Sequence, residues 1–141
     1  MSFVPKDLDG SSWESIEPFM NDLRDRKLSC SNCLETFIAD RSSLSEVISE
    51  ARARLYIDMT CHTDDEDIQK SWMQFVENVQ PKLSEYSDIL NRRLVEHEAL
   101  DELPERFGIL VKGIKTDIAI FREENIPLST QATKLVTEYN E

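Results

Sequence analysis

Apolar residues recur every three or four positions between Thr63 and His97, which is the spacing of one face of an α-helix. Pro81 falls on the opposite, polar side of this helix, and the apolar spacing continues through it unchanged. Because proline removes one backbone hydrogen bond and crowds the preceding turn, we expect a kink at Pro81 and not a break. At about 1.5 Å per residue, the helix would be on the order of 50 Å long. Its apolar face consists of Ile68, Trp72, Phe75, Val79, Leu83, Tyr86, Leu90, Leu94 and His97.

Three shorter amphipathic segments precede this helix, after an irregular lead-in over residues 1–10. Ser11 or Ser15 is expected to cap the first segment, which ends near residue 27. Ser31 lies near the start of the second, and Ser43, with a glutamate three residues later, is expected to open the third. The three apolar faces consist of Ile16, Phe19, Met20 and Leu23; Leu34, Phe37 and Ile38; and Leu44, Val47, Ile48, Ala51, Leu55 and Met59.

The segment after His97 predicts a helix, beginning at Pro104, that is apolar on two opposite sides. One side consists of Phe107, Leu110, Val111, Ile114, Ile118 and Phe121, and the other of Ile109, Gly113, Thr116 and Ile120. A helix that is apolar on both sides is usually buried on both sides. We therefore expect the second side either to be covered or to be exposed where a further part of the protein would pack.

The end of the chain predicts one more helix. Residues 125–127, Asn-Ile-Pro, are expected to break the preceding helix, and Ser129 to cap the last one. This helix would contain Leu135, Val136 and Tyr139, and it reaches Glu141 without a stop signal. We expect the chain to be part of a longer protein.

These segments together predict an all-α fold, because no stretch alternates apolar and polar residues as a strand would. The expected architecture is a bundle of five to six helices organised around the one long kinked helix. A length of 141 residues, with 40% hydrophobic residues, 3 glycines and 5 prolines, is typical of one globular, helix-rich domain. We assign residues 1–141 to a single helical domain.

The charge and cysteine content restrict the partners and the location. A formal net charge of −12 would repel nucleic-acid phosphates and anionic membranes, so neither is an expected partner. No apolar run has the length of a membrane span. Three cysteines are an odd number in a domain of this size, which favours a reducing compartment, and we expect a cytoplasmic location.

Three stretches resemble a known family. They are Phe-Val-Pro-Lys-Asp-Leu-Asp at residues 3–9, followed by Trp13; Tyr-Ile-Asp-Met-Thr-Cys-His-Thr-Asp at residues 56–64; and Phe-Arg-Glu-Glu-Asn-Ile-Pro-Leu at residues 121–128. They are similar to the N-terminal region of oligoendopeptidase F-like enzymes, which belong to the M3 family of zinc metallopeptidases. The resemblance implies a helical region that packs against a catalytic region and helps wall a deep substrate channel. It also implies a parent enzyme that hydrolyses short peptides with one zinc ion.

The zinc-binding signature of that family is absent from this chain. The family binds zinc through His-Glu-x-x-His on one helix, where the two histidines share a face and the glutamate activates water. Here the sequence from His97 to Asp101 is His-Glu-Ala-Leu-Asp, and the second histidine of the chain is the distant His62. We therefore assign no catalytic, cofactor-binding or metal-binding residue, and we interpret His97 as a helix-end residue.

Other groups of reactive residues have simpler structural interpretations. Cys30 and Cys33, together with Cys61 and His62, could in principle complete a zinc site, but structural cysteines are favoured over metal or redox use. Thr63 is expected to cap the start of the long helix, and the acidic residues at 64–67 follow it where the helix dipole favours them. They lack the spacing of a calcium loop. A second acidic group is interpreted as a solvated helix end; it consists of Glu96, Glu98, Asp101 and Glu102. An aromatic group is interpreted as part of the core; it consists of Trp72, Phe75 and Tyr86.

Two functional classes remain. The first is the non-catalytic N-terminal helical region of an M3-type zinc metalloendopeptidase, whose partners would be the catalytic region of its own chain and, in the parent enzyme, short peptides. The second is a free-standing helical protein-interaction module without an enzymatic role. A third, weaker alternative is a small zinc or redox protein that uses the cysteines. In either of the first two cases an exposed apolar stripe would allow self-association. The expected cofactor content is none in this segment, with zinc implied for the full-length enzyme.

Overall fold

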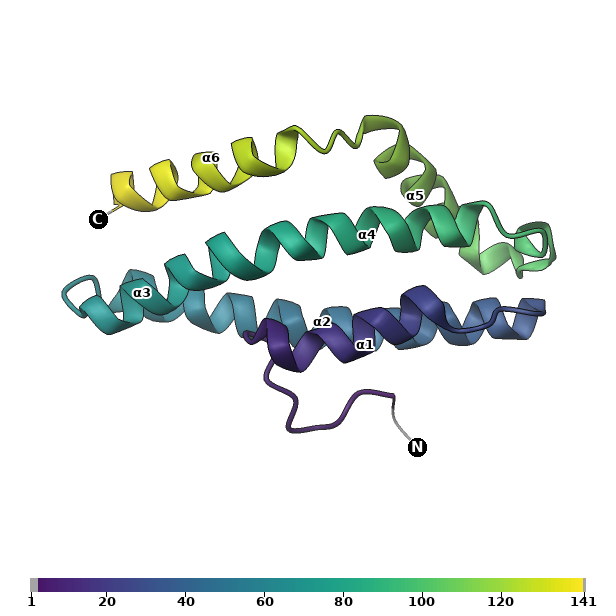
Figure 1. Cartoon of the computed structure of the whole chain (residues 1–141), viewed down its shortest axis with the longest axis horizontal. Helices are drawn as coiled ribbons and strands as arrows, with labels where there is room; N and C mark the ends of the chain where they lie inside the picture. The colour runs from purple at the N-terminus through teal and green to yellow at the C-terminus, as the bar shows by residue number, and fades with distance from the viewer. Residues whose placement is uncertain (1–2, 141) are drawn as a thin grey trace.

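The computed structural model describes residues 3–140, with the side chain of Asn140 excepted, and over this range it is an all-α bundle without strands (Figure 1). This confirms the predicted fold class. The elements are α1 Trp13–Asp25, α2 Ser31–Cys61, α3 Glu66–Gln74, the π-helical turn η1 Phe75–Val79, α4 Gln80–Val95, the 3₁₀ turns η2 Leu100–Glu102 and η3 Glu105–Phe107, α5 Gly108–Ile120 and α6 Asn125–Asn140. No helix in the described range is both long and apolar enough to span a membrane. The start of the expected lead-in, at Met1 and Ser2, and the expected end of the last helix, at Glu141, lie outside the described range.

The predicted long helix is confirmed, because α3, η1 and α4 follow one another without a break from Glu66 to Val95. Pro81 lies in the first turn of α4, directly after the π-helical turn. In that turn the N–H of Gln80 bonds to the carbonyl of Phe75, five residues back instead of four. Proline has no N–H and its ring crowds the carbonyl four residues earlier, so a wider turn before it allows the helix to continue. The sequence pattern predicts continuity but not the π-helical turn.

The start of the long helix is capped by Asp65, two residues after the expected cap Thr63. One carboxylate oxygen of Asp65 accepts hydrogen bonds from the backbone N–H groups of Asp67 and Ile68, at 3.0 and 3.2 Å. The side chain thereby satisfies two donors that lack partners within the helix.

The long helix lies at the centre of the bundle. In Figure 1, α1 and α2 lie along one side of it, α6 lies along the opposite side, and α5 packs near its C-terminal end. The main core combines α1, α2 and the long helix. It includes Ile16, Met20, Leu23, Leu34, Phe37, Leu44, Ile48, Phe75, Val79, Leu90 and Leu94, each at most 8% exposed. Burial of one such side chain stabilises the folded state by about 1.5–3 kcal/mol. The apolar face predicted for the long helix therefore provides much of the stability of the bundle.

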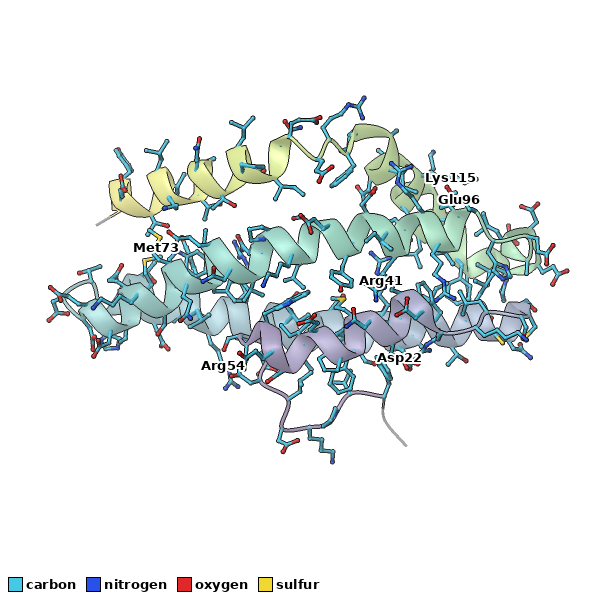
Figure 2. The ribbon with its side chains drawn as sticks, in the orientation of Figure 1. Asp22, Arg41, Arg54, Met73, Glu96 and Lys115 are labelled. Carbon is cyan, nitrogen blue, oxygen red and sulfur yellow. The ribbon has the colours of Figure 1, made fainter. Side chains whose placement is uncertain are left out.

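The expected helix start at Ser43 is wrong. Residues 31–61 form one helix of 31 residues, and no glycine or proline interrupts it. The Ser43 hydroxyl donates to the carbonyl of Ala39 at 3.1 Å, so it bonds within the helix and does not cap a new one. Arg41, on the same helix, extends toward α4 and donates to the Ser87 hydroxyl at 3.1 Å (Figure 2). The apolar residues assigned to two helices therefore form one continuous face.

Three other expected boundaries differ from the structure. The cap of α1 is Ser12, between the two expected serines, and it makes no side-chain capping bond. Pro104 precedes a 3₁₀ turn, and α5 begins only at Gly108. The break expected at residues 125–127 lies instead at residues 121–124, because α6 starts at Asn125. Pro127 is thus in the first turn of α6, where backbone N–H groups have no partner within the helix, so the N–H that proline lacks costs no hydrogen bond.

Replacing Phe75 with alanine should lower the free energy of unfolding by about 3–5 kcal/mol, because the ring is 1% exposed and its removal leaves a cavity. Urea unfolding followed by circular dichroism would measure this. The control is Ile57→Ala, at a side chain 56% exposed on α2, which should change stability by about 0.5 kcal/mol or less. A loss under about 1 kcal/mol for Phe75→Ala would contradict the assignment of this residue to the core.

The attachment of α6 should depend on Thr137. The Trp72 indole N–H donates to the Thr137 hydroxyl at 3.0 Å, and Thr137 is 3% exposed. Thr137→Val keeps the shape but leaves the indole N–H without an acceptor, which should cost about 1–3 kcal/mol. Hydrogen exchange should then speed up in α6 more than in α4. Thr133→Val is the control, because its hydroxyl bonds only to Ser129 within α6; equal effects from the two variants would refute the assignment.

Candidate functional site

The two histidines lie at opposite ends of the bundle. His97 follows α4, and its Nε2 lies 2.7 Å from the carbonyl of Leu28 while its Nδ1 accepts the N–H of Ala99 at 3.0 Å. Both ring nitrogens therefore bond to the backbone, with Nε2 as the donor, and the ring holds the α1–α2 loop against the end of α4. His62 is the exposed C-cap of α2, at the far end of a helix about 46 Å long.

This arrangement does not fit a zinc ion. Across the described residues, no three His, Cys, Asp or Glu side chains are grouped closely enough to hold a metal. A catalytic zinc needs three protein ligands and an open position for water. The described part of the chain therefore does not assemble a site for zinc hydrolysis.

The cysteines are divided between the two ends of α2. Cys30 is the N-cap of α2 and Cys33 lies in its first turn, and their sulfur atoms are 2.9 Å apart. Cys61 is the last residue of α2, so it and His62 cannot join Cys30 and Cys33 in one site. A hydrogen bond from the Cys30 thiol, with further bonds from Ser29, lowers the pKa of Cys33 from 9.0 to about 7. The Cys-x-x-Cys spacing already grouped these two thiols in the sequence, where a structural role was favoured. The structure adds the contact between their sulfur atoms.

The acidic and aromatic groups take the places expected of them. Residues 64–67 lie around the start of α3, in an open hollow beside His62. The acidic residues at 96, 98, 101 and 102 lie beyond the end of α4, at the surface of the bundle. Trp72 and Phe75 are each 1% exposed and belong to the core. Tyr86 packs against the core and donates its hydroxyl to the Asn21 side chain at 2.6 Å.

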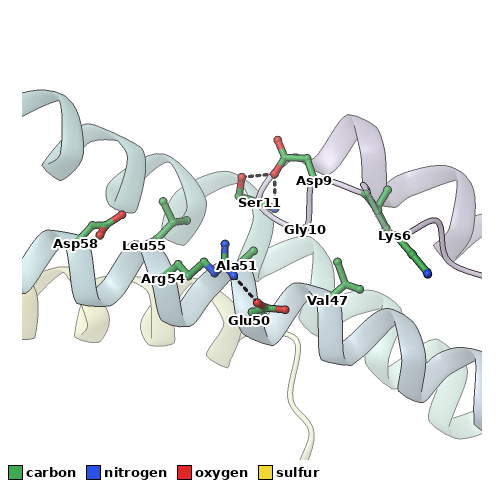
Figure 3. A pocket seen from close by; sticks show the side chains of 11 residues that line it. Lys6, Asp9, Gly10, Ser11, Val47, Glu50, Ala51, Arg54, Leu55 and Asp58 are labelled. Atoms are coloured by element: carbon green, nitrogen blue, oxygen red, sulfur yellow. Dashed lines mark hydrogen bonds and ion pairs between the residues drawn. The ribbon is translucent and has the colours of Figure 1, made fainter.

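A hollow of about 400 Å³ separates the N-terminal lead-in from α2 (Figure 3). Charges of both signs line it, and the Arg54 guanidinium pairs with the Glu50 carboxylate at 2.7 Å. Gly10 closes one side; a Cβ at this position would lie 2.6 Å from the carbonyl oxygen of Val47, so only glycine lets the two backbones approach. The Ser11 hydroxyl and the Ser11 backbone N–H both donate to one carboxylate oxygen of Asp9, so this pair closes the turn before α1. The hollow does not define an active site.

The two C-terminal helices expose apolar side chains. Ile109 and Ile120, on the second side of α5, are 90% and 67% exposed, while Ile114 on the first side is 7% exposed. A Cβ added to Gly113 would meet nothing within 4 Å, so the second side is open along its length. Of the two outcomes expected for this side, the structure shows the exposed one.

Helix α6 packs on the long helix through polar groups and carries apolar side chains on other sides. Thr137 accepts the Trp72 indole N–H, and Lys134 pairs with Glu77 at 2.7 Å. Met73 of α3 lies between the two helices (Figure 2). The exposed side chains of α6 are Leu128, Leu135, Val136 and Tyr139, between 58% and 90% exposed. Together with Ile109 and Ile120 they are called the outer surface below.

The threonines of α6 were not predicted to take part in packing, although the sequence holds a signal for it. Thr130, Thr133 and Thr137 follow one another at steps of three and four, so they share one face of a helix. From the sequence, the apolar residues of α6 are expected to be buried. In the structure Thr137 is buried and Leu135 is exposed. The described residues thus define a helical packing domain without an assembled catalytic centre.

The comparisons with known proteins agree with that class. The family model described as Peptidase M3 N-terminal domain matches residues 8–121. The chain therefore belongs to the family of M3 peptidase N-terminal domains. This confirms the resemblance at the level of the M3 family, and the matched range contains the stretch at residues 56–64 but ends at the first residue of the stretch at 121–128. No curated protein and no solved structure gave a significant match.

The lowered pKa of Cys33 predicts its reactivity. Alkylation of Cys33 by iodoacetamide should rise with pH around a midpoint of about 7. Cys30→Ala removes the donated hydrogen bond, should raise that midpoint toward 9.0, and should slow alkylation near neutral pH about fivefold. Peptide mapping by mass spectrometry would follow each cysteine, with Cys61 as the internal control. Unchanged Cys33 kinetics in Cys30→Ala would show that the thiol–thiol contact does not activate it.

Proposed function

We propose that this chain is the non-catalytic N-terminal helical region of an oligoendopeptidase F-like M3 metallopeptidase, where it docks on the catalytic region and helps wall the channel that receives short peptides. The observation that carries the proposal is the outer surface. Its six side chains are 58–90% exposed. Ile109 and Ile120 lie within the range that matches the M3 N-terminal domain, and the four side chains of α6 follow that range. A set of this size on two consecutive helices is typical of a surface that another part of a protein covers.

The energetics of the outer surface favour burial. Covering one such side chain contributes about 1.5–3 kcal/mol to the free energy of binding. Burial of only part of the set would therefore offset the entropy that is lost on association. The inner side of α6 rests on the long helix through Thr137 and through the exposed pair of Lys134 and Glu77, which holds it weakly. Docking of a catalytic region on the outer surface would hold α6 from both sides.

The positions of the two histidines support assigning zinc chemistry to the catalytic region and a structural role to this chain. Zinc and its ligands are proposed to belong to the catalytic region, since His97 is occupied by backbone groups and His62 is remote from it. The role proposed for this chain is mechanical: it supplies a rigid wall of packed helices. A cytoplasmic location, and the absence of nucleic acid and anionic membrane among its partners, stay predictions from charge and cysteine content.

The alternative is a free-standing interaction module. It would use the outer surface for a different protein, and it requires no catalytic region. Without any partner, both proposals predict self-association through the outer surface.

Docking can be measured between this chain and a separately produced M3 catalytic region encoded by the same gene. The double variant Ile120→Glu with Leu135→Glu should weaken binding in calorimetry at least about tenfold, because it places charges in a desolvated interface. Addition of the wild-type chain should raise hydrolysis of a quenched short peptide by the catalytic region. The double variant should raise it less.

Ile57→Glu is the matched control, because Ile57 is 56% exposed but lies on α2, outside the outer surface. It should leave binding unchanged. Equal loss in both variants, or no binding by the wild-type chain, would refute the proposed docking. A gene without a zinc-binding His-Glu-x-x-His region would favour the interaction module.

A further inference from the structure

The first turn of α2 brings two thiols together in an accessible place. The Sγ atoms of Cys30 and Cys33 lie 2.9 Å apart, Cys30 is exposed and Cys33 is half-buried. The Ser29 hydroxyl lies 3.7 Å from the Cys33 sulfur. The Cys30 side chain makes no capping bond, so it is free to react. Neither thiol takes part in the core or in the outer surface.

The surrounding contacts hold this geometry in place. The loop before Cys30 is fixed where His97 Nε2–H donates to the carbonyl of Leu28, at 2.7 Å. After Cys30, the helix continues into Leu34, which is fully buried. The two sulfur atoms are therefore held at 2.9 Å, and a disulfide bond of about 2.05 Å needs a further approach of roughly 0.9 Å. A Cys-x-x-Cys pair at a helix N-terminus is also the setting in which one thiol ionises readily.

We propose that Cys30 and Cys33 form a reversible redox site, at which a low-molecular-weight disulfide such as glutathione disulfide converts the two thiols into an intramolecular disulfide. The site differs from the zinc arrangement considered from the sequence, because Cys61 and His62 lie at the other end of α2. It is independent of the proposed docking function.

The reaction balances in two exchanges. The Cys33 thiolate attacks one sulfur of glutathione disulfide, which forms a mixed disulfide on Cys33 and releases one glutathione thiolate. Cys30 then loses its proton to solvent and attacks the Cys33 sulfur, which releases the second glutathione thiolate. The two protein thiols lose two electrons and two protons, and one glutathione disulfide becomes two glutathione thiols. Cys33 is the first nucleophile because the bond donated by Cys30 lowers its pKa to about 7.

The test treats the reduced full chain with glutathione disulfide near neutral pH and maps the products by mass spectrometry. The peptide that holds residues 30 and 33 should lose two hydrogen atoms, and dithiothreitol should restore them. Cys61 is exposed and has no thiol beside it within the described residues, so it should gain a glutathionyl group and keep it until dithiothreitol is added. Cys61 is thus an internal control for access of the reagent.

Two variants separate the roles of the thiols. Cys30→Ser should stop the reaction at a glutathionyl group on Cys33, and serine is a good N-cap, so α2 should be retained. Cys33→Ser should leave Cys30 reacting several-fold more slowly than Cys33 does in the wild type. Circular dichroism would check the fold of both.

The proposal is overturned if Cys30 and Cys33 each carry a separate glutathionyl group. It is equally overturned if both stay reduced while Cys61 is modified. Because no peptidase activity is measured, failure here would leave the docking proposal standing, and failure of docking would leave this site standing.

Discussion

Burial of one apolar stripe on the continuous helix from Glu66 to Val95 is the constraint on which the bundle depends. Helices α1 and α2 bury their own apolar faces against it, α5 packs near its end, and α6 has the long helix as its main support. Pro81 lies within this helix, and a π-helical turn lets the helix pass it. A loop at that point would separate Phe75 and Val79 from Leu90 and divide the main core.

The two sides of the long helix are packed by different physical means. Toward α1 and α2 the buried contacts are mainly apolar, with hydrogen bonds such as those from Tyr86 to Asn21 and from Arg41 to Ser87 among them, which makes this side the stable part of the fold. Toward α6 they include a buried Trp72–Thr137 hydrogen bond and an exposed ion pair, which stabilise less. The apolar residues of α6 are directed elsewhere, and this asymmetry is the physical basis for the proposed docking surface.

The ends of α2 have separate chemical characters because the helix is unbroken. Its N-terminus holds two adjacent thiols, with His97 fixing the loop before them, and its C-terminus holds Cys61 and His62 beside the acidic start of α3. A rigid helix of 31 residues keeps these groups apart. Metal ligation across them is thereby prevented, whereas thiol chemistry at the N-terminus needs only neighbours within one turn.

Local periodicity was enough to determine the all-α class, the long helix and its buried face, because both follow from spacing along the chain. The quoted stretches likewise identified the M3 family. The helix start at Ser43 was mispredicted because a serine hydroxyl can cap a helix or bond within one, and here it bonds within α2. The start at Ser129 was mispredicted because α6 already begins at Asn125 and accepts Pro127 in its first turn. An amphipathic pattern also cannot state which face finds a partner. Only the tertiary structure decided that Thr137 is buried on α6 while Leu135 is exposed. The physical reason is that the buried indole N–H of Trp72 donates to the Thr137 hydroxyl, which a leucine side chain could not accept.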